Sequence, residues 1–308
     1  MFGQPMPYAG GISMEFIVNV FLNSLLNIAA LTLATMGITL IFKTSYTTNF
    51  AQGSIAAFCG YIAAVLMGKH GMSVWATLAA AVAIGFILAA LVDIVLFRRG
   101  RAVNALSKQI ITMGLVIMIS AAIPMIFGAA DISVNMVFFG GVWRFSLFGK
   151  SFSVIIDAVF CFLLAAAVLT TIFVLLKYSK WGLSVRATAA NEYVAQMMGI
   201  NTKRVTALTW GIAGALGAVC GIMLLTLTTQ MNAGYMVGTQ VDAFMSGILG
   251  GMNTFAGPVL GAVIISLLRF IFIYYFSEWA NVCIYAIILL IVLIRPMGLL
   301  GKKTVIKV

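Results

Sequence analysis

Nine apolar stretches divide this sequence and limit its possible folds more than any other feature. A helix needs about 20 mainly apolar residues to cross the hydrocarbon core of a bilayer. The first stretch is long enough to tilt or break. The seventh is short and Gly-rich and could be a half-crossing, so eight to ten crossings would also fit. The stretches are 16–42, 51–67, 73–97, 110–129, 152–176, 205–229, 239–252, 255–276 and 279–295.

Composition supports a chain that lies in lipid. Of 308 residues, 63% are hydrophobic and 8% are charged, whereas soluble domains average about half apolar and a quarter charged. A soluble fold could not cover so much apolar surface. The sequence therefore predicts an all-α, polytopic transmembrane helical bundle that forms a single domain over 1–308. The four cysteines lie far apart in apolar stretches and predict neither a disulfide framework nor a metal site.

The basic residues are gathered in a few connections between the apolar stretches. Fourteen of the 18 Lys and Arg lie in the loop around Arg99, in the loop 177–204, in the C-terminal tail and at Lys43. Basic loops stay on the cytoplasmic side, and nine crossings place all four groups on one side. We expect the N-terminus outside and the C-terminus in the cytoplasm. This distribution argues against nucleic acid as a partner, despite the net charge of +11.

Patterns typical of catalysis and cofactor binding are missing from the sequence. It has one histidine, His70, in a short loop, and no HExxH, GxSxG or Cys/His cluster. It also lacks the GxxxxGK[ST] motif that cradles ATP phosphates. We therefore expect no enzymatic activity, no cofactor and no metal, and any ATP-driven action has to come from partner subunits.

Ionisable residues at membrane depth are candidates for function, because a charge in lipid is costly. Asp157 and Asp242 lie about a turn inside the predicted outer ends of their segments, and Arg269 lies well inside 255–276. Arg269 could form an ion pair or serve a solute pathway, and both interpretations stay open. Asp93, near an inner end, is expected to snorkel or to pair locally. No line of acidic residues crosses the bundle, which disfavours a proton-coupled carrier.

One predicted helix, 205–229, carries a face of small residues. Its glycines at 211, 214, 217 and 221 fall three or four residues apart. Small residues let helices approach closely in lipid. We expect this face to pack tightly within the bundle.

The long basic connection 177–204 differs from a flexible linker. Its run SVRATAANEYVAQMMG predicts one short helix that ends at Gly199. A short helix at a membrane surface has to bury its apolar side against headgroups or in a groove of a cytoplasmic protein. The predicted apolar contacts are Val185, Ala189, Val194, Ala195 and Met198.

Four ordered motifs resemble those of permeases from branched-chain amino acid ABC importers. The loop YSKWGLSVRATAANEYVAQMMGIN is similar to that family's YSxxGxxxRAxxxNxxxAxxxGIN. The runs at 49–61, 247–264 and 294–301 resemble three further family motifs, and the resemblance spans nearly the whole chain. In the loop, the matching residues are Gly182, Arg186, Ala187, Asn191, Ala195, Gly199, Ile200 and Asn201.

The resemblance implies a translocation subunit of an ATP-driven importer in the cytoplasmic membrane of a prokaryote. The implied partners are a second permease, identical or different, two cytoplasmic ATP-binding subunits and an extracytoplasmic solute-binding protein. Residues 182–201 would form the coupling helix, with Arg186 and Glu192 as its charged members. The implied cargo is a small polar solute, with branched-chain amino acids first and urea, short amides, sugars or nucleosides as alternatives.

Two polar, Gly-interrupted stretches in opposite halves of the chain are the candidate solute pathway. They contribute Asn49, Gln52 and Ser54 from NFAQGS, and Asn253 and Thr254 from GGMNTFAG. Transporters built from inverted halves often break helices near the pathway, so an inverted pseudo-repeat is also expected. Many family members have His and an acidic residue in place of Gln52 and Ser54, which bears on the cargo and not on the transport class.

Two other functional classes compete with the permease. A secondary carrier or channel would work without an ATPase partner, whereas a permease subunit should show no uptake alone. A membrane-embedded enzyme or scaffold is disfavoured by the missing catalytic clusters.

Overall fold

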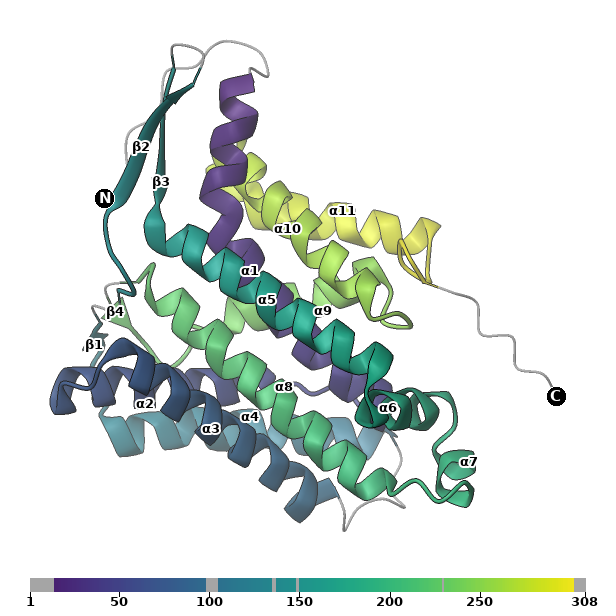
Figure 1. Ribbon diagram of the computed structural model, residues 1–308. Helices are drawn as coiled ribbons and strands as arrows, with labels where there is room; N and C mark the ends of the chain where they lie inside the picture. The colour runs from purple at the N-terminus through teal and green to yellow at the C-terminus, as the bar shows by residue number, and fades with distance from the viewer. Residues whose placement is uncertain (1–13, 98–104, 135–136, 148–149, 229, 302–308) are drawn as a thin grey trace.

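The computed structural model describes residues 14–97, 105–134, 137–147, 150–228 and 230–301, which form a helical bundle (Figure 1). The helices are α1 (Met14–Ser45), α2 (Gln52–His70), α3 (Val74–Val92), α4 (Ala105–Phe127), α5 (Ile156–Tyr178), α6 (Lys180–Ala190), α7 (Glu192–Met197), α8 (Thr202–Leu225), α9 (Val237–Gly250), α10 (Ala256–Tyr275) and α11 (Ala280–Ile294). A π-helical turn, Asp93–Phe97, continues α3, and a 3-10 turn, Ser277–Trp279, precedes α11.

Four short strands lie at one end of the bundle, which we call the β end (Figure 1). β1 (Ile132–Ser133) pairs with β4 (Gln230–Met231), and β2 (Val142–Leu147) pairs with β3 (Lys150–Ile155), both antiparallel. The prediction of a helix from residue 152 is therefore wrong at its start. Ser151, Phe152, Ser153 and Val154 alternate polar and apolar side chains, which suits a strand.

The two long helices α1 and α8 form the centre of the bundle and pack against each other. The membrane-length windows of these helices are 89% and 78% buried. The predicted small-residue face of α8 explains the close packing: an added Cβ at Gly214 would lie 2.2 Å from the carbonyl oxygen of Gly85 in α3. Tight packing at this face is confirmed.

Apart from α6 and α7, successive helices alternate in direction between the β end and the opposite end, where α6 and α7 lie (Figure 1). At the α6–α7 end, Lys43 in the last turn of α1 donates a hydrogen bond to the Asn253 carbonyl between α9 and α10. The C-terminal segment joins there, since the amide of Leu299 donates to the carbonyl oxygen of Leu249 at 2.8 Å. This alternation agrees with the predicted order of crossings. The side of the membrane that each end faces stays a prediction.

Packing in the second half of the chain repeats that of the first half in the opposite direction. α1 packs against α10 as α8 packs against α3, and α2 packs against α8 as α9 packs against α1. α4 lies beside α2 as α11 lies beside α9. This arrangement supports an inverted pseudo-repeat that relates α1–α4 to α8–α11.

The first helical residue of α2, Gln52, is buried, and the first turn of α9 lies against the first turn of α2. Gln52, the first residue of α2, donates a hydrogen bond to the carbonyl oxygen of Ala213, halfway along α8. Gln240, in the first turn of α9, lies against Gly53 of α2. The two helix starts therefore meet, and α2 and α9 run from there toward opposite ends (Figure 1).

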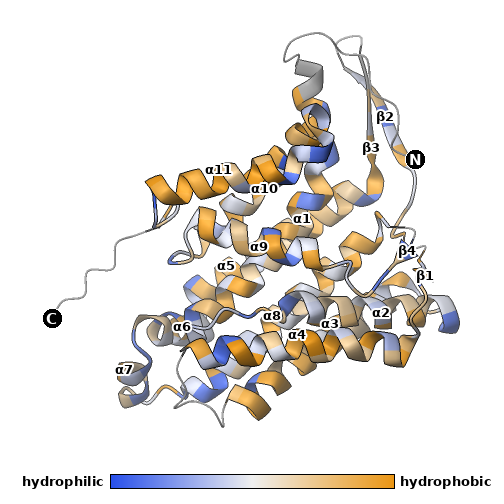
Figure 2. Cartoon of the chain, turned by 180° about the vertical axis from the view of Figure 1, so that it is seen from behind, coloured by the Kyte–Doolittle hydropathy of each residue, from blue (hydrophilic) through white to orange (hydrophobic). Residues whose placement is uncertain are grey.

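Seven of the described helices are long and apolar enough to cross a membrane: α1, α3 with its π-helical turn, α4, α5, α8, α10 and α11, the last with its 3-10 turn. α2 and α9 complete the nine predicted segments as helices. α9 has 14 residues, or about 21 Å, so it is too short to span a hydrocarbon core of about 30 Å. The helices α3, α4 and α11 consist mainly of hydrophobic residues (Figure 2), and each exposes large apolar side chains, such as Ile87, Ile117 and Leu293.

Some sequence predictions fall on residues outside the described ranges. These are the position of the N-terminus and the basic residues Arg98, Arg99, Arg101, Lys302, Lys303 and Lys307.

Candidate functional site

A small cavity of about 110 Å³ lies where the first turns of α2 and α9 face α4. Its wall is mainly apolar. The polar side chains in the wall are those of Ser54, Ser120 and Gln240, one from each helix. The remaining lining residues are Phe50, Gly53, Ala57, Val116, Ala233, Met236, Val237 and Val241.

Of the predicted pathway residues, Ser54 lines this cavity, while Asn49 and Gln52 lie buried behind its wall. Gln52 is 1% exposed. Its side-chain nitrogen lies 2.6 Å from the Ala213 carbonyl oxygen, and its side-chain oxygen accepts from Asn49 Nδ2 at 3.2 Å. Gln52 therefore ties α2 to α8. Asn49 Oδ1 in turn accepts the amide N–H of Ala51 at 3.0 Å, just before α2.

The other two predicted pathway residues, Asn253 and Thr254, lie at the opposite end of α9 from the cavity. They form the turn between α9 and α10, where Thr254 Oγ1 accepts the amide N–H of Gly257 at 3.1 Å. Gly251 in this turn has φ +96, and its approach to Met297 leaves no space for a side chain. The structure does not bring this stretch together with Ser54.

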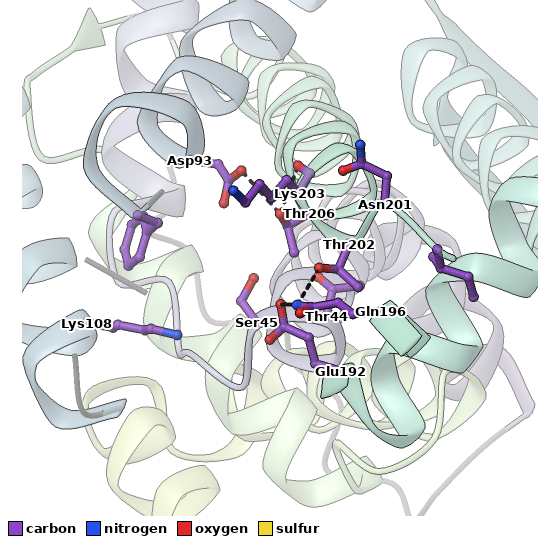
Figure 3. Close-up of a pocket in the computed structure, with 12 residues that line it drawn as sticks. Thr44, Ser45, Asp93, Lys108, Glu192, Gln196, Asn201, Thr202, Lys203 and Thr206 are labelled. Carbon is purple, nitrogen blue, oxygen red and sulfur yellow. Dashed lines mark hydrogen bonds between the residues drawn. The ribbon is translucent and has the colours of Figure 1, made fainter. Parts of the chain in front are cut away.

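A larger cavity of about 680 Å³ opens at the α6–α7 end, and Figure 3 shows its polar lining. It lies among the end of α1, the π-helical turn after α3, the start of α4, α7 and the start of α8. The full lining is Thr44, Ser45, Asp93, Phe97, Lys108, Glu192, Gln196, Ile200, Asn201, Thr202, Lys203 and Thr206.

Two hydrogen-bonded groups line opposite parts of the large cavity. Thr206 Oγ1 lies 3.3 Å from Asp93 Oδ2, which joins α8 to the π-helical turn. Asp93 is 3% exposed, which excludes the first of the two predicted alternatives, snorkelling, while the local ion pair stays a prediction. Gln196 Nε2 donates to Thr202 Oγ1 at 3.0 Å and to Glu192 at 3.3 Å (Figure 3). Lys108 extends from α4 into the space between these groups.

The predicted single helix between α5 and α8 is two helices, α6 and α7, so that prediction is wrong. The break is at Asn191, which is extended (φ −162, ψ 111) and whose side-chain oxygen accepts the Val194 amide N–H at 3.1 Å to cap α7. Asn residues favour this capping role because the side chain satisfies a helix-start N–H.

The residues that carry the family resemblance in this loop mostly shape it. Gly182 approaches the end of α5 so closely that an added Cβ would lie 2.3 Å from the Leu175 carbonyl oxygen. Gly199 has φ +81, which favours glycine. Asn201 caps α8 by accepting the Arg204 amide N–H at 3.2 Å. Arg186 donates to the Lys177 carbonyl, and Ala187 O accepts the N–H of Asn191.

The apolar residues of the loop divide differently from the prediction. Val185 and Ala195 are buried within the chain, at 0% and 3% exposure. Ala195 is therefore not an exposed contact for a partner. Instead, α7 and the next residue expose four large side chains, which we call the α7 patch: Tyr193 (70%), Val194 (51%), Met197 (72%) and Met198 (78%).

The three predicted intramembrane charges all have structural partners. Asp157, in the first turn of α5, accepts the amide N–H groups of Phe138, Phe139 and Gly140 at 3.3, 2.9 and 3.1 Å. Asp242 and Arg269 form an ion pair between α9 and α10. Asp242 lies one residue after Val241, which lines the small cavity. The ion pair with Arg269 therefore fixes α9 next to a residue of the cavity wall.

The model of a known family matches residues 20–293, and its description is the permease component of the branched-chain amino acid transport system. The chain belongs to this permease family. It is 28% identical to the high-affinity branched-chain amino acid transport system permease protein LivH of Salmonella typhimurium, over 90% of this chain and 92% of the relative.

More distant relatives extend the comparison. The probable branched-chain amino acid transport permease protein LivH of Methanocaldococcus jannaschii is 27% identical over 88% of each chain. The fructose import permease protein FruF of Bifidobacterium longum is 24% identical over 76% of this chain and 64% of the relative. No solved structure matches.

The family assignment agrees with the fold. The chain is a multi-pass transmembrane permease subunit of an ABC-type importer in the cell membrane, and its role is transport. Sequence reasoning did not find Gln240, Val116 or Ser120. Their contribution depends on which face of α9 and α4 meets α2, and that face is set by packing between segments far apart in the sequence.

Proposed function

We propose that this chain is the translocation subunit of an importer for branched-chain amino acids. In the proposed assembly it pairs with a second permease, two cytoplasmic ATP-binding subunits drive it, and an extracytoplasmic solute-binding protein delivers the solute. Family membership over residues 20–293 carries the proposal. The LivH relatives, named for branched-chain amino acid transport, support the cargo.

The α7 patch supports docking of an ATP-binding subunit. Its four large side chains are exposed at the end of the bundle where α6 and α7 protrude (Figure 1). Lipid-facing helices also expose apolar side chains. α7, however, has only six residues and lies between two polar caps, Asn191 and Asn201, so it is not a helix that crosses lipid. Large apolar and aromatic side chains of this kind act as anchors in protein grooves.

The small cavity supports an aliphatic rather than a sugar cargo. A sugar ring needs polar partners around its edge, whereas this wall offers three polar side chains among apolar ones. Its volume of about 110 Å³ is somewhat below the 150 Å³ or so of a cavity that takes benzene. A branched aliphatic side chain suits that size. The FruF relative makes a sugar the second candidate cargo.

Reconstitution tests the cargo. The importer, assembled from this chain with a second permease, ATP-binding subunits and a solute-binding protein, is placed in proteoliposomes with radiolabelled leucine. We expect ATP-dependent uptake that unlabelled valine and isoleucine reduce and that fructose and urea leave unchanged. Reduction of uptake by fructose alone, or no leucine uptake by an assembly that hydrolyses ATP, would contradict the proposal.

A further inference from the structure

We propose that the solute moves along one face of α4, from the small cavity to the large cavity, and that residues 48–50 form a gate between the two. The proposal rests on the proposed transport function, and it states where in this chain the solute passes.

The two cavities lie along the same face of α4. Ser120 and Val116 line the small cavity, and Lys108 lines the large one. Residues four positions apart are neighbours on a helix surface, so Thr112 lies between Lys108 and Val116 and therefore between the two cavities. Thr112 is fully buried, at 0% exposure. The space on this face is therefore interrupted at Thr112 and open on both sides of it.

The interruption consists of hydrogen bonds between α4 and the segment that follows α1. Thr112 Oγ1 donates to the Gln109 carbonyl oxygen of its own helix at 2.8 Å, and it lies 3.3 Å from the Thr48 carbonyl oxygen and accepts from the Phe50 amide N–H at 3.4 Å. Gln109 Nε2 donates to Thr48 Oγ1 at 3.2 Å. The Phe50 ring packs on Phe244 of α9, with ring centroids 5.0 Å apart. Residues of the segment after α1, of α4 and of α9 thus close the face with a few weak contacts, and such contacts can break when the gate opens.

The same segment is connected to α6. Tyr46 is the one non-glycine residue with positive φ, at +48, among those described. Its hydroxyl lies 2.5 Å from the Ala189 carbonyl oxygen of α6. A bulky residue held in this region stores local strain. Movement of α6 and α7 would therefore displace Tyr46. Tyr46 is two residues before Thr48, whose carbonyl oxygen contacts Thr112.

This arrangement assigns tasks to individual residues. Val116 and Ala57 limit the size of the aliphatic group in the small cavity. Thr112 and Phe50 hold the gate closed. Tyr46 transmits the movement of α6 to the gate, and the polar wall of the large cavity receives the charged backbone groups of an amino acid after the gate opens.

The first test measures leak. Proteoliposomes that contain the assembled importer are loaded with radiolabelled leucine, and its efflux is followed without ATP. Thr112→Val removes the hydroxyl and keeps the shape, so we expect efflux to rise about fivefold as the open state gains population. Thr171→Val is the control, because Thr171 is an exposed threonine of α5 that donates only to its own helix at Ala167. Equal efflux from both variants and wild type would overturn the gate.

The second test measures size selection on α4. Val116→Phe places a phenyl ring in the small cavity. The control is Ile117→Phe, which adds the same side chain at the next residue, where the native side chain is 73% exposed. We expect leucine uptake to fall at least about tenfold with the first variant and to stay within about twofold with the second. Equal uptake by both variants would show that the solute does not use this face.

The third test separates transmission from closure. We expect Tyr46→Phe to reduce ATP-driven uptake several-fold without raising efflux. Loss of uptake together with a leak would place Tyr46 in the gate itself and contradict the assigned transmission role.

Cysteine labelling tests the gate without depending on the cargo. In a cysteine-free chain, Ser54→Cys and Ser45→Cys report on the small and large cavities. With the native Thr112, we expect a membrane-impermeant thiol reagent to reach each cysteine from one side of the membrane only. In the Thr112→Val variant, we expect reagent added on a single side to reach both cysteines. If Thr112→Val does not change the labelling, the gate is refuted. If the labelling changes as expected but leucine is not taken up, only the proposed cargo is refuted.

Discussion

Arg269 Nη2 on α10 lies 2.6 Å from each carboxylate oxygen of Asp242 on α9. The Tyr285 hydroxyl on α11 adds a third contact, 3.0 Å from Asp242 Oδ1. The side chains are 20% and 8% exposed for Arg269 and Asp242. An ion pair is strong where water is scarce, but each charge is costly there if its partner is removed. This group therefore makes α9, α10 and α11 a single unit and fixes the wall of the small cavity that α9 provides.

The two members of this pair should differ in the effect of their loss. Asp242→Ala leaves a guanidinium that cannot lose its proton, so we expect a loss of about 3 kcal/mol or more in stability. Arg269→Met leaves a carboxyl group that can take up a proton and keep the Tyr285 hydrogen bond, so its cost should be smaller. Thermal unfolding of the two purified variants in detergent measures the difference. A lower midpoint for Arg269→Met than for Asp242→Ala would contradict this account.

Gln52 should matter for stability and not for solute preference, because its side chain points to α8 and not into the small cavity. Gln52→Ala removes the bond to the Ala213 carbonyl, and we expect a cost of about 1–2 kcal/mol. Ser54→Ala, two residues on, should leave stability unchanged within about 0.5 kcal/mol and alter the ratio of valine to leucine uptake. Thermal unfolding and competition uptake of both variants separate the two roles, and a changed ratio for Gln52→Ala would contradict them.

Membrane sidedness follows from the distribution of basic residues and can be measured at two exposed positions. In a cysteine-free chain, Tyr193→Cys in α7 should be protected from an impermeant thiol reagent in intact cells. Trp143→Cys in β2, where the native side chain is 61% exposed, should be labelled. Permeabilised cells provide the control, in which both positions react. The reverse pattern in intact cells would invert the predicted topology.

The sequence predicts the helices well because hydrophobicity along the chain is a local property. All nine apolar stretches contain helices, including the short one at α9. The β2–β3 pair was missed because Phe152, Val154 and Ile155 directly precede the apolar run of α5 and were merged with it. The alternation of polar and apolar residues from Ser151 to Val154 was the signal for a strand.

The candidate site is harder to predict because it depends on contacts between distant segments. Asp242 and Arg269 are recognisable singly as intramembrane charges, yet their pairing needs the packing of α9 on α10. Asn253 and Thr254 share a polar, Gly-rich character with Gln52 and Ser54, but they lie at the far end of α9. Contacts such as Thr48 with Thr112, 64 residues apart, leave no periodic signal in either segment.

The coupling role of the α7 patch is the central claim of this account, and co-purification with uptake tests it most directly. Met197→Asp places a charge on the patch, while Lys180→Asp places the same charge at the exposed start of α6. Loss of an interface side chain that contributes about 2 kcal/mol weakens binding to the partner subunit roughly thirtyfold. We predict that Met197→Asp inserts normally but loses the ATP-binding subunits and ATP-driven leucine uptake, whereas Lys180→Asp retains both. Retention of the ATP-binding subunits and of uptake by Met197→Asp would contradict the account.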